Sequence, residues 1–497
     1  PDAIQTVGDK KEKPRRKVCP ADISEELARQ MQELSLEAFK SLQLRDFARV
    51  DIRLDENNQI YLLEINSMAS LGASGSYVRA AKEAGYDFDA LVQRMLDVAV
   101  VRYFSEQAQT PAEQQKSGSN NILVRMRSFM RSRSEQNEKL LQRLVDLNTY
   151  VRNKEGVDKA GMLVNRALKS LGFDQEVLHN VEIGNSLFFS NHPGNEMDVL
   201  FLGHLDTAVK SDSHEYYREK EQKILGTGVW ENKGGIVTLI QALQALRFAR
   251  KLSRIKIGVL LTSDNTLHNP FMRDKIADLS SRSKYVIGLS GAALSGSIIT
   301  SRSGGAVYRW SATLKKEADA FMLSSSVSQV NKVLSKLATL SDSKNGVLVL
   351  PTRMSVKSDI NQLWMHAEAT ISVRYSEEES FTGLGNTIYQ MLHDKKLKGL
   401  TLSFDGGKTR PPMLHNEKST AFYQTVRHMS RELDIYIEEE QRWSSGSVGF
   451  VKGDGAVLDG FGPVGRASEE GGNYILRHSL SEKSILLAAT LLQISKS

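Results

Sequence analysis

Apolar and polar residues alternate with two different periods along the first hundred residues. Over 21–43 the apolar positions are spaced for one face of a helix, and they are Ile23, Leu27, Met31, Leu34, Ala38 and Leu42. From Arg49 to Asn66 the sequence RVDIRLDENNQIYLLEIN alternates apolar and polar residues around a polar turn at Asn57-Asn58. Such alternation predicts a β-hairpin.

A second pattern begins near residue 136, where apolar runs alternate with helical stretches. The runs 198–208, 254–264 and 283–291 are apolar over most of their length, as expected of strands that are buried on both faces. Helical crossovers between such strands predict a mostly parallel α/β sheet. Residues 306–410 differ, because they show the order strand, helix, strand, strand, helix, strand, which predicts an inserted α+β domain.

These patterns divide the chain into a small α+β domain, a linker and an α/β domain with an insertion. We predict the first domain over 1–104 and the linker over 105–135, where the residues are first polar and then basic. The α/β domain is predicted over 136–305 and 411–497, with the insertion at 306–410 between its two parts. A chain of 497 residues is too long for one core, which agrees with several domains.

Composition and charge exclude several classes of protein. Hydrophobic residues make up 40% and charged residues 25% of the chain, and no apolar run approaches the roughly 18 residues of a membrane span. The polar, basic start does not resemble a secretory signal, and Pro1 in place of Met predicts a fragment or a processed product. The single cysteine, Cys19, excludes an internal disulfide and suits a reducing cytoplasm. A net charge of +6 is too mild to predict a nucleic-acid partner.

The predicted hairpin carries side chains that suit a cation. Glu64 and Asn66 point to the same face of one strand, and Asp51 lies on the strand that pairs with it. Two carboxylates and an amide oxygen are hard ligands of the kind that Mg²⁺ prefers. Arg49 shares the face of Asp51 and could stabilise negative charge on a reacting carbonyl. A solvent-exposed face that carries charges without a metal is an equally good interpretation of the spacing.

Three motifs of this region are CPADI (19–23), ARVDIRLDENNQIYLLEIN (48–66) and YVRAAKEAGYDFDALVQRML (77–96). They resemble the C-terminal part of D-alanine–D-alanine ligases, in the ATP-grasp superfamily, over residues 17–98. The resemblance implies ATP and Mg²⁺ as cofactors, with Asp51, Glu64 and Asn66 holding the magnesium ions that bridge the ATP phosphates. It also implies that Arg49 stabilises the tetrahedral intermediate when an acyl phosphate is joined to an amine.

Two departures from the ligase pattern concern the acceptor substrate and the domains that a whole ligase contains. The Pro-Gly that follows the Glu-x-Asn pair in the family is replaced by SMASLGASGSY at 67–77, which is one residue longer. A serine of this loop contacts the acceptor amino acid in the family; Ser74 or Ser76 could serve, and we predict Ser76 as the catalytic one. The family's N-terminal and central domains, which hold the adenine, have no counterpart here, and we expect them upstream of Pro1.

A second motif, GHLDTA, places His204 and Asp206 at the mouth of a predicted buried strand. Farther along, GTGVWENKGG sets Glu231 just before the glycine-rich start of a helix. A histidine, an orienting aspartate and another acid at strand ends could form part of a zinc site. A hydrogen-bonded pair of loop residues is an equally good interpretation.

Motifs of a longer resemblance are NKEGVDKAGMLVNRALKSLGF (153–173), LGHLDTA (202–208), GTGVWENKGG (226–235), NQLWMHAEATISVRY (361–375) and LDGFGPVG (458–465). With them, residues 136–497 resemble zinc exopeptidases and amidohydrolases of the carboxypeptidase G and aminoacylase family. The resemblance implies a catalytic α/β domain with an inserted dimerisation domain. Residues 306–410 fit the inserted domain, which implies a homo-oligomer.

The zinc site of that family is only partly kept in this sequence. His204 takes the place of the first histidine ligand, and Asp206 takes the place of its aspartate helper. Glu231 stands where the family has a bridging aspartate, and its side chain is longer by one methylene.

The remaining positions of the zinc site have changed. The family's Glu-Glu pair falls on Asn265-Thr266, which removes the general base, because an amide cannot accept a proton from water at neutral pH. A further acid falls on Ser290, and the final histidine falls near Glu469. With these ligands lost, the basis for zinc is lost as well, and we predict a peptidase-like domain without hydrolytic activity.

Together the two resemblances predict an ATP-dependent carboxylate–amine ligase of the D-alanine–D-alanine ligase type, present as a C-terminal fragment fused to an inactive peptidase-like domain. Its substrate would be an amino acid or a peptide, and we expect a cytoplasmic protein without membrane or nucleic-acid partners. Two alternatives stay open: a metal-dependent amidohydrolase or carboxypeptidase with an altered metal site, and a non-catalytic dimeric scaffold.

Overall fold

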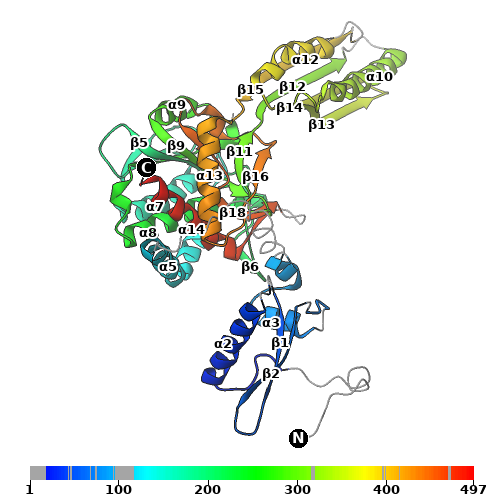
Figure 1. The fold of residues 1–497 in the computed structure, drawn as a ribbon. Helices are drawn as coiled ribbons and strands as arrows, with labels where there is room; N and C mark the ends of the chain where they lie inside the picture. Colours follow the sequence, from blue (N-terminus) through cyan, green and yellow to red (C-terminus); the bar gives the residue numbers. More distant parts are fainter. Residues whose placement is uncertain are drawn as a thin grey trace, which may run out of the picture. The chain divides into compact units, whose positions relative to one another are not determined.

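In the computed structural model the chain folds into two compact units, Pro1–Gln115 and Lys116–Ser497 (Figure 1). The structure describes residues 18–42, 44, 47–67, 69–72, 75–92, 94–95, 117–314, 319–393, 397, 399–413, 415–467 and 472–496, with the backbone alone for 117–121. No helix within these ranges is long and apolar enough to cross a lipid bilayer.

The first unit is built on the predicted hairpin. Its elements are α2 (Glu25–Ser41), β1 (Arg49–Leu54), β2 (Ile60–Asn66) and α3 (Ser76–Glu83). The side chain of Ser24 caps α2 by accepting a hydrogen bond from the backbone N–H of Leu27 at 3.3 Å. Among the described residues of this unit, only Ala69 and Leu91 are buried apolar residues, so its own core is small.

A short polar turn joins the two strands of the hairpin. The Asp55 carboxylate accepts the backbone N–H groups of Asn57 and Gln59 at 2.9 and 2.8 Å, and Asn58 adopts a left-handed conformation with φ of 63°. β1 and β2 then pair antiparallel with one bulge beside Asp51.

The second unit contains a six-stranded sheet in the order β17-β9-β5-β8-β4-β3. Its strands are β3 (Asp174–Leu178), β4 (Ser186–Ser190), β5 (Met197–His204), β8 (Ile257–Thr262), β9 (Ser283–Gly288) and β17 (Ala456–Leu458). The four strands β17, β9, β5 and β8 are parallel, while β4 and β3 are antiparallel to their neighbours. The predicted mostly parallel α/β architecture is confirmed.

Helices pack on both faces of this sheet. They are α5 (Ser117–Ser132), α6 (Ser134–Val145), α7 (Lys154–Lys169), α8 (Gly234–Phe248), α9 (Arg273–Ser281), α13 (Glu417–Glu432) and α14 (Arg477–Ile494). Val199 and Phe201 of β5 belong to the larger core, whereas Leu200 and Leu202 of the same strand belong to a smaller core with Ile276 of α9. Burial on both faces explains why this strand is a continuous apolar run.

Shorter strands and single-turn helices complete the α/β domain. A five-stranded sheet has the order β10-β18-β19-β7-β6, and β11 pairs in parallel with β16. The strands are β6 (Arg218–Lys220), β7 (Lys223–Leu225), β10 (Gly291–Ala292), β11 (Ile298–Arg302), β16 (Glu439–Arg442), β18 (Gly462–Ala467) and β19 (Asn473–Leu476). The short helices are η2 (Ser211–Ser213), η3 (Val229–Lys233), η4 (Leu252–Arg254), η5 (Asn265–Leu267) and η8 (Ser447–Phe450).

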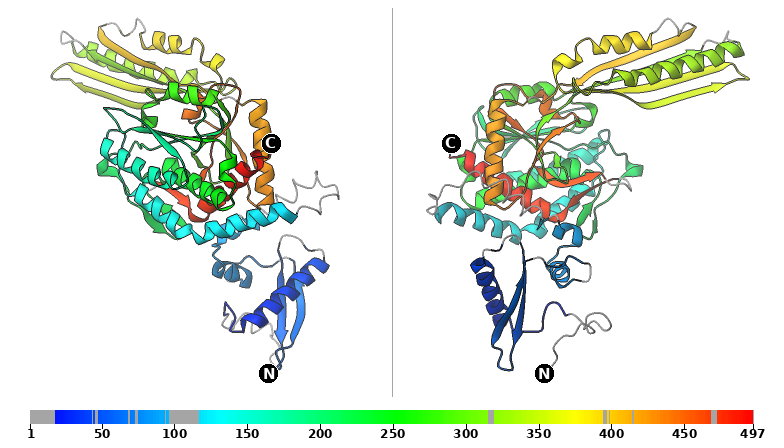
Figure 2. Two further views of the ribbon diagram at one scale, coloured as in Figure 1. Left: turned by 90° about the vertical axis from the view of Figure 1, so that its left-hand side faces the viewer. Right: turned by 45° about the vertical axis from the view of Figure 1, so that its right-hand side comes forward.

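The insertion is a four-stranded antiparallel sheet in the order β13-β14-β12-β15, with its own apolar core. Its elements are β12 (Gly304–Leu314), α10 (Ala320–Leu337), η6 (Ala338–Leu340), β13 (Val347–Asp359), β14 (Trp364–Tyr375), α11 (Glu378–Phe381), α12 (Leu384–Leu392) and β15 (Leu400–Arg410). Figure 2 shows α10 and α12 on one face of this sheet. The order of strands and helices is the one that the sequence predicts for 306–410.

Part of the segment that we predict as a linker, 105–135, is an integral helix of the second unit. α5 places Leu123, Met126 and Met130 in the larger core, and Figure 2 shows it, in cyan, alongside the α/β domain. The polar and basic composition hides this role, because only one apolar stripe of the helix is needed for packing.

Candidate functional site

The first candidate site lies on one face of the hairpin. Asp51 stands directly opposite Glu64, and Arg49 stands directly opposite Asn66. Arg49 donates from Nε to Asp51 Oδ1 at 2.8 Å and from Nη2 to Asp51 Oδ2 at 3.0 Å. The same guanidinium lies 3.8 Å from Glu64 Oε1, so one cation faces both carboxylates. The register thus gathers the four residues that the sequence singles out.

These four side chains are accessible to a ligand. The side chains of Arg49, Asp51 and Glu64 are 32%, 38% and 63% exposed. The hydrogen bond that Arg49 donates to Asp51 raises the pKa of Arg49, an effect that burial opposes and the charges of Asp51 and Glu64 support. Two exposed carboxylates and the amide of Asn66 are a donor set that fits Mg²⁺, and Arg49 balances their charge when no cation is bound.

The serine predicted to contact the acceptor amino acid lies farther along the chain. Ser76 is the exposed first residue of α3, after Gly75 as the N-cap residue. Its catalytic role stays a prediction, and the other candidate, Ser74, lies outside the described residues.

The second candidate site is a pocket at the carboxyl ends of the parallel strands of the α/β domain. Its polar lining includes His204 at the end of β5, Asn265 after β8, Ser290 after β9 and Asp459 after β17. Arg302 of β11 and Glu231 of η3 (Val229–Lys233) line it as well, so the pocket brings the predicted residues His204 and Glu231 together. The carboxyl edge of a parallel sheet is where α/β proteins commonly bind ligands. The cavity volume of ≈ 70 Å³ is far below the several hundred Å³ typical of ligand pockets, so no peptide fits inside it.

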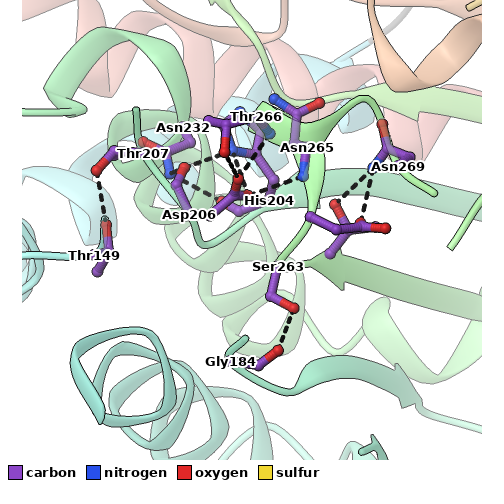
Figure 3. Close-up of polar contacts among 12 residues, drawn as sticks. Thr149, Gly184, His204, Asp206, Thr207, Asn232, Ser263, Asn265, Thr266 and Asn269 are labelled. Carbon is purple, nitrogen blue, oxygen red and sulfur yellow. Dashed lines mark hydrogen bonds and ion pairs between the residues drawn. The ribbon is translucent and has the colours of Figure 1, made fainter. Parts of the chain in front are cut away.

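A hydrogen-bond network fixes His204 at the pocket (Figure 3). Its Nδ1 donates to the backbone oxygen of Asp206 at 2.9 Å, which leaves Nε2 as the unprotonated nitrogen of the neutral ring. Asn232 Nδ2 donates to the backbone oxygens of His204 and Asp206, both at 3.1 Å. These hydrogen bonds set the orientation of His204.

The carboxylate of Asp206 accepts hydrogen bonds from residues within the protein. It accepts the N–H and the Oγ1–H of Thr266 at 2.8 and 2.7 Å, and the N–H of Asn265 at 3.2 Å (Figure 3). Burial alone would raise the pKa of Asp206, but His204 and Thr266 outweigh it and hold this pKa below its usual value. Asp206 is thus an ionised, fully buried anchor of the loop that carries Asn265 and Thr266.

The other predicted zinc positions do not form a ligand set. Glu231 is exposed, within the single turn η3, and Ser290 Oγ donates to Asp459 Oδ2 at 3.1 Å. Asn265 Oδ1 accepts a hydrogen bond from Arg410 at 2.9 Å, while Glu469 lies outside the described residues. In the part of the chain that the structure describes, no three His, Cys, Asp or Glu side chains are grouped for a metal ion. The residues present do not fit a two-zinc centre.

Two buried arginines beside the pocket were not predicted from the sequence. Arg302 Nε donates to Asp459 Oδ2 at 2.8 Å, and Arg302 and Asp459 are 5% and 1% exposed. Arg410, also 5% exposed, bonds to Asn265 and Asn269. The partners are more than a hundred positions apart in the sequence, so no local signal could reveal the pairs.

Comparison with known proteins matches the first unit to a ligase family. Residues 8–97 match the family model described as D-ala D-ala ligase C-terminus. The chain is 47% identical over 88 residues to the uncharacterized protein y4sG of Sinorhizobium fredii, covering 18% of this chain and 26% of that protein. It is 35% identical over 85 residues to the D-alanine–D-alanine ligase of Desulfovibrio desulfuricans, covering 17% and 28%. The chain therefore spans about a quarter of the length of these relatives.

The remainder of the chain shares the fold of M20 family peptidases. It superposes on the aminopeptidase PepT of Bacillus cereus with a TM-score of 0.56 and 14% identity, over 73% of this chain and 98% of that one. For human carnosine dipeptidase 1 the TM-score is 0.58 and the sequence identity is 11%, over 76% of this chain and 100% of that one. The YXEP protein of Bacillus subtilis is described as a dinuclear metal binding peptidase from the M20 family. Its TM-score is 0.53 and its sequence identity is 11%, over 74% of this chain and 99% of that one. Both predicted resemblances are confirmed, the second as a likeness of fold.

Proposed function

We propose that this chain is the C-terminal part of an ATP-dependent carboxylate–amine ligase, joined to an M20-like domain that does not hydrolyse peptides. The observation that carries the proposal is the hairpin face, where Asp51 opposes Glu64, Asn66 lies beside them and Arg49 contacts both acids. The family match of residues 8–97 supports the same reaction class.

The hairpin residues divide the work of such a reaction. Asp51, Glu64 and Asn66 would hold Mg²⁺, which screens the phosphate oxygens of ATP when it is bound. Arg49 now neutralises Asp51, and once a cation shares that carboxylate its guanidinium can stabilise negative charge on the reacting carbonyl group. The substrates are amino acids or peptides, and D-alanine as the acceptor is not carried over because the loop after Asn66 departs from the family.

The first unit needs more of the ATP-grasp fold to act. The matched region corresponds to about a quarter of the length of the ligase relatives, and the unit has only two buried apolar residues among those described. We place the adenine-holding part of the fold upstream of the matched residues.

The M20-like domain supports binding or assembly in place of hydrolysis. Hydrolysis by this fold family needs a base to activate water, and the positions that would supply acids carry Asn265, Thr266 and Ser290. Hydrogen bonds from Thr266 and Arg302 hold the carboxylates of Asp206 and Asp459 inside the protein, whereas Glu231, which also lines the pocket, is exposed.

The inserted domain supports a homodimer. β13 is an edge strand of its sheet and exposes Leu348, Leu350 and Met354, at 39%, 48% and 60%. A long edge strand with exposed apolar residues is a surface that folded proteins normally cover, and a second copy of β13 would cover it.

The ligase proposal is tested with Mg²⁺ and ATP on the natural polypeptide that contains this chain. Phosphate release from ATP should depend on an added amino acid and should fall at least about a hundredfold in Glu64→Gln, because a metal-holding carboxylate is lost. The matched control is Glu56→Gln, at the exposed hairpin turn, which should keep full activity. Equal activity in Glu64→Gln and the control would refute the assignment of the hairpin.

A second candidate is an amidohydrolase with an altered metal centre, and the retained, fixed orientation of His204 is what favours it. Zinc content and amidase activity of the protein separate the two candidates. Bound zinc together with turnover that is lost in His204→Ala would replace the proposal of an inactive domain.

A further inference from the structure

The chain crosses between the α/β domain and the inserted domain twice, and each crossing carries one buried arginine. The outgoing crossing, 302–305, begins with Arg302, and the returning crossing, 410–413, begins with Arg410. The crossings are bonded to each other, since Met413 N donates to Arg302 O at 2.9 Å and Arg302 N donates to Met413 O at 3.3 Å. Both arginines are 5% exposed.

Arg302 ties the outgoing crossing to two loops of the α/β domain. Its Nε donates to Asp459 Oδ2 at 2.8 Å, in the loop after β17. Its Nη1 donates to the backbone oxygen and to Oγ of Ser444 at 3.1 and 3.0 Å. A planar guanidinium that is bonded at both ends can hardly rotate, so this crossing is anchored.

Arg410 ties the returning crossing to the loop after β8. Its Nη2 donates to Asn265 Oδ1 and Asn269 Oδ1, both at 2.9 Å, and also to the backbone oxygen of Asn265. Among the described residues no carboxylate forms an ion pair with Arg410, so amide oxygens hold its charge. Burial lowers the pKa of Arg410 to about 10, which leaves the guanidinium charged at neutral pH.

We propose that Arg302 and Arg410 form a two-point clamp that fixes the inserted domain on the α/β domain in one arrangement, with no metal or ligand needed to hold it. Pro411 and Pro412 stiffen the returning crossing beside Arg410. The clamp makes the second unit a single rigid body.

The clamp also couples the inserted domain to the pocket. Asn265 lines the pocket, donates its N–H to Asp206 and accepts two hydrogen bonds from Arg410. Asp206 in turn accepts from Thr266 and positions His204. A shift of the returning crossing would therefore move residues that shape the pocket.

Distances between spin labels on the full chain test the clamp. Cys19, the single cysteine, is replaced by Ser, and labels are attached at Asp274→Cys on α9 and Lys336→Cys on α10, two exposed positions. The unmodified clamp should give one narrow distance distribution, and Arg410→Gln should give a broad one. The matched control is Arg309→Gln, because Arg309 is 74% exposed and forms an ion pair with Asp405 of its own sheet. A broad distribution with the clamp intact, or a narrow one in Arg410→Gln, would overturn the proposal.

A second measurement covers the case in which Arg410→Gln fails to fold. Asn269→Asp keeps an acceptor for Arg410, whereas Asn269→Ala removes it, and both lose the donor bonds from Asn269 to Thr262 and Asp264, so their comparison isolates the bond to Arg410. Hydrogen exchange in the two variants is followed at the amides of 302–305 and 410–413. Because one charge-assisted hydrogen bond is lost in Asn269→Ala, the opened population should rise by about tenfold to a hundredfold at these amides, with exchange in β5 unchanged. Unchanged exchange at both crossings would count against the clamp.

Discussion

The pair of Arg302 and Asp459 allows a quantitative test of how the pocket is held together. Asp459 accepts hydrogen bonds from Arg302 Nε at 2.8 Å, from Ser290 N and Oγ at 3.1 Å each, and from Gly460 N at 2.7 Å. Asp459→Asn keeps the size and one acceptor oxygen but removes the charge. The guanidinium of Arg302 then stays buried without a carboxylate.

Removing one partner of a buried ion pair costs about 3–5 kcal/mol, whereas the whole free energy of unfolding of a domain is about 5–15 kcal/mol. Asp459→Asn should therefore lose about a fifth or more of the free energy of unfolding of the second unit. The matched control is Lys284→Met, because Lys284 forms an ion pair with Asp198 at the same 2.8 Å but is 74% exposed. Such an exposed pair is worth about 0–1 kcal/mol, so burial and not distance decides the difference.

Urea unfolding followed by tryptophan fluorescence measures the effect, because all four tryptophans lie in the second unit. The double variant Arg302→Met with Asp459→Asn removes both charges, and its loss should be about 1–3 kcal/mol smaller than the sum of the single losses. A loss below about 1 kcal/mol for Asp459→Asn, equal to that of the control, would refute the reasoning from burial.

The same pair sets an expected pH dependence. Burial alone would raise the pKa of Asp459, but Arg302 and the hydrogen bonds from Gly460 and Ser290 outweigh it, so this pKa lies below its usual value. The stabilisation is complete above the unfolded-state pKa of about 3.9 and is lost as the pH falls through the lower folded-state pKa. Asp459→Asn should remove this acid-side loss.

Three further predictions address metal, pH and assembly. Chelation by EDTA should leave the unfolding midpoint of the second unit within about 2 °C, and a larger drop that zinc reverses would contradict the absence of a fitting donor set. Burial, and then the charges of Arg410 and neighbouring arginines, lower the pKa of His268 from 6.5 to about 4, so stability should be full above about pH 6.5 and decline towards pH 4. His268→Gln should flatten that decline, and an unchanged slope would show that other groups cause it. Leu350→Glu with Met354→Glu should turn a dimer into a monomer in light scattering, whereas Val181→Glu, at a 94% exposed site, should not.

The local pattern of apolar and polar residues is sufficient to predict the hairpin and most of the order of helices and strands. Side chains in a strand repeat every two residues, so the alternation over 49–66 and the turn at Asn57-Asn58 together predict that Asp51 meets Glu64. The helix predicted over 21–43 is found as Glu25–Ser41, where capping and helix-favouring residues decide the ends.

Tertiary packing decides whether a polar helix belongs to a linker or to the core, which composition cannot show. The linker predicted over 105–135 includes α5, whose Met126 and Met130 are buried. A helix with a narrow apolar stripe has the same composition whether or not another surface covers that stripe, so only the tertiary structure assigns it to the core.

The resemblance of the sequence to zinc exopeptidases predicts that the acids of a peptidase centre are replaced at Asn265, Thr266 and Ser290, because residue identity determines which chemistry is possible. Only the tertiary structure shows what took their place. Arg302 reaches Asp459 across 157 positions, and Arg410 reaches Asn265 across 145. Such contacts depend on strand order and on the path of the chain between domains. Neither produces a periodic pattern in the sequence around the residues that come into contact.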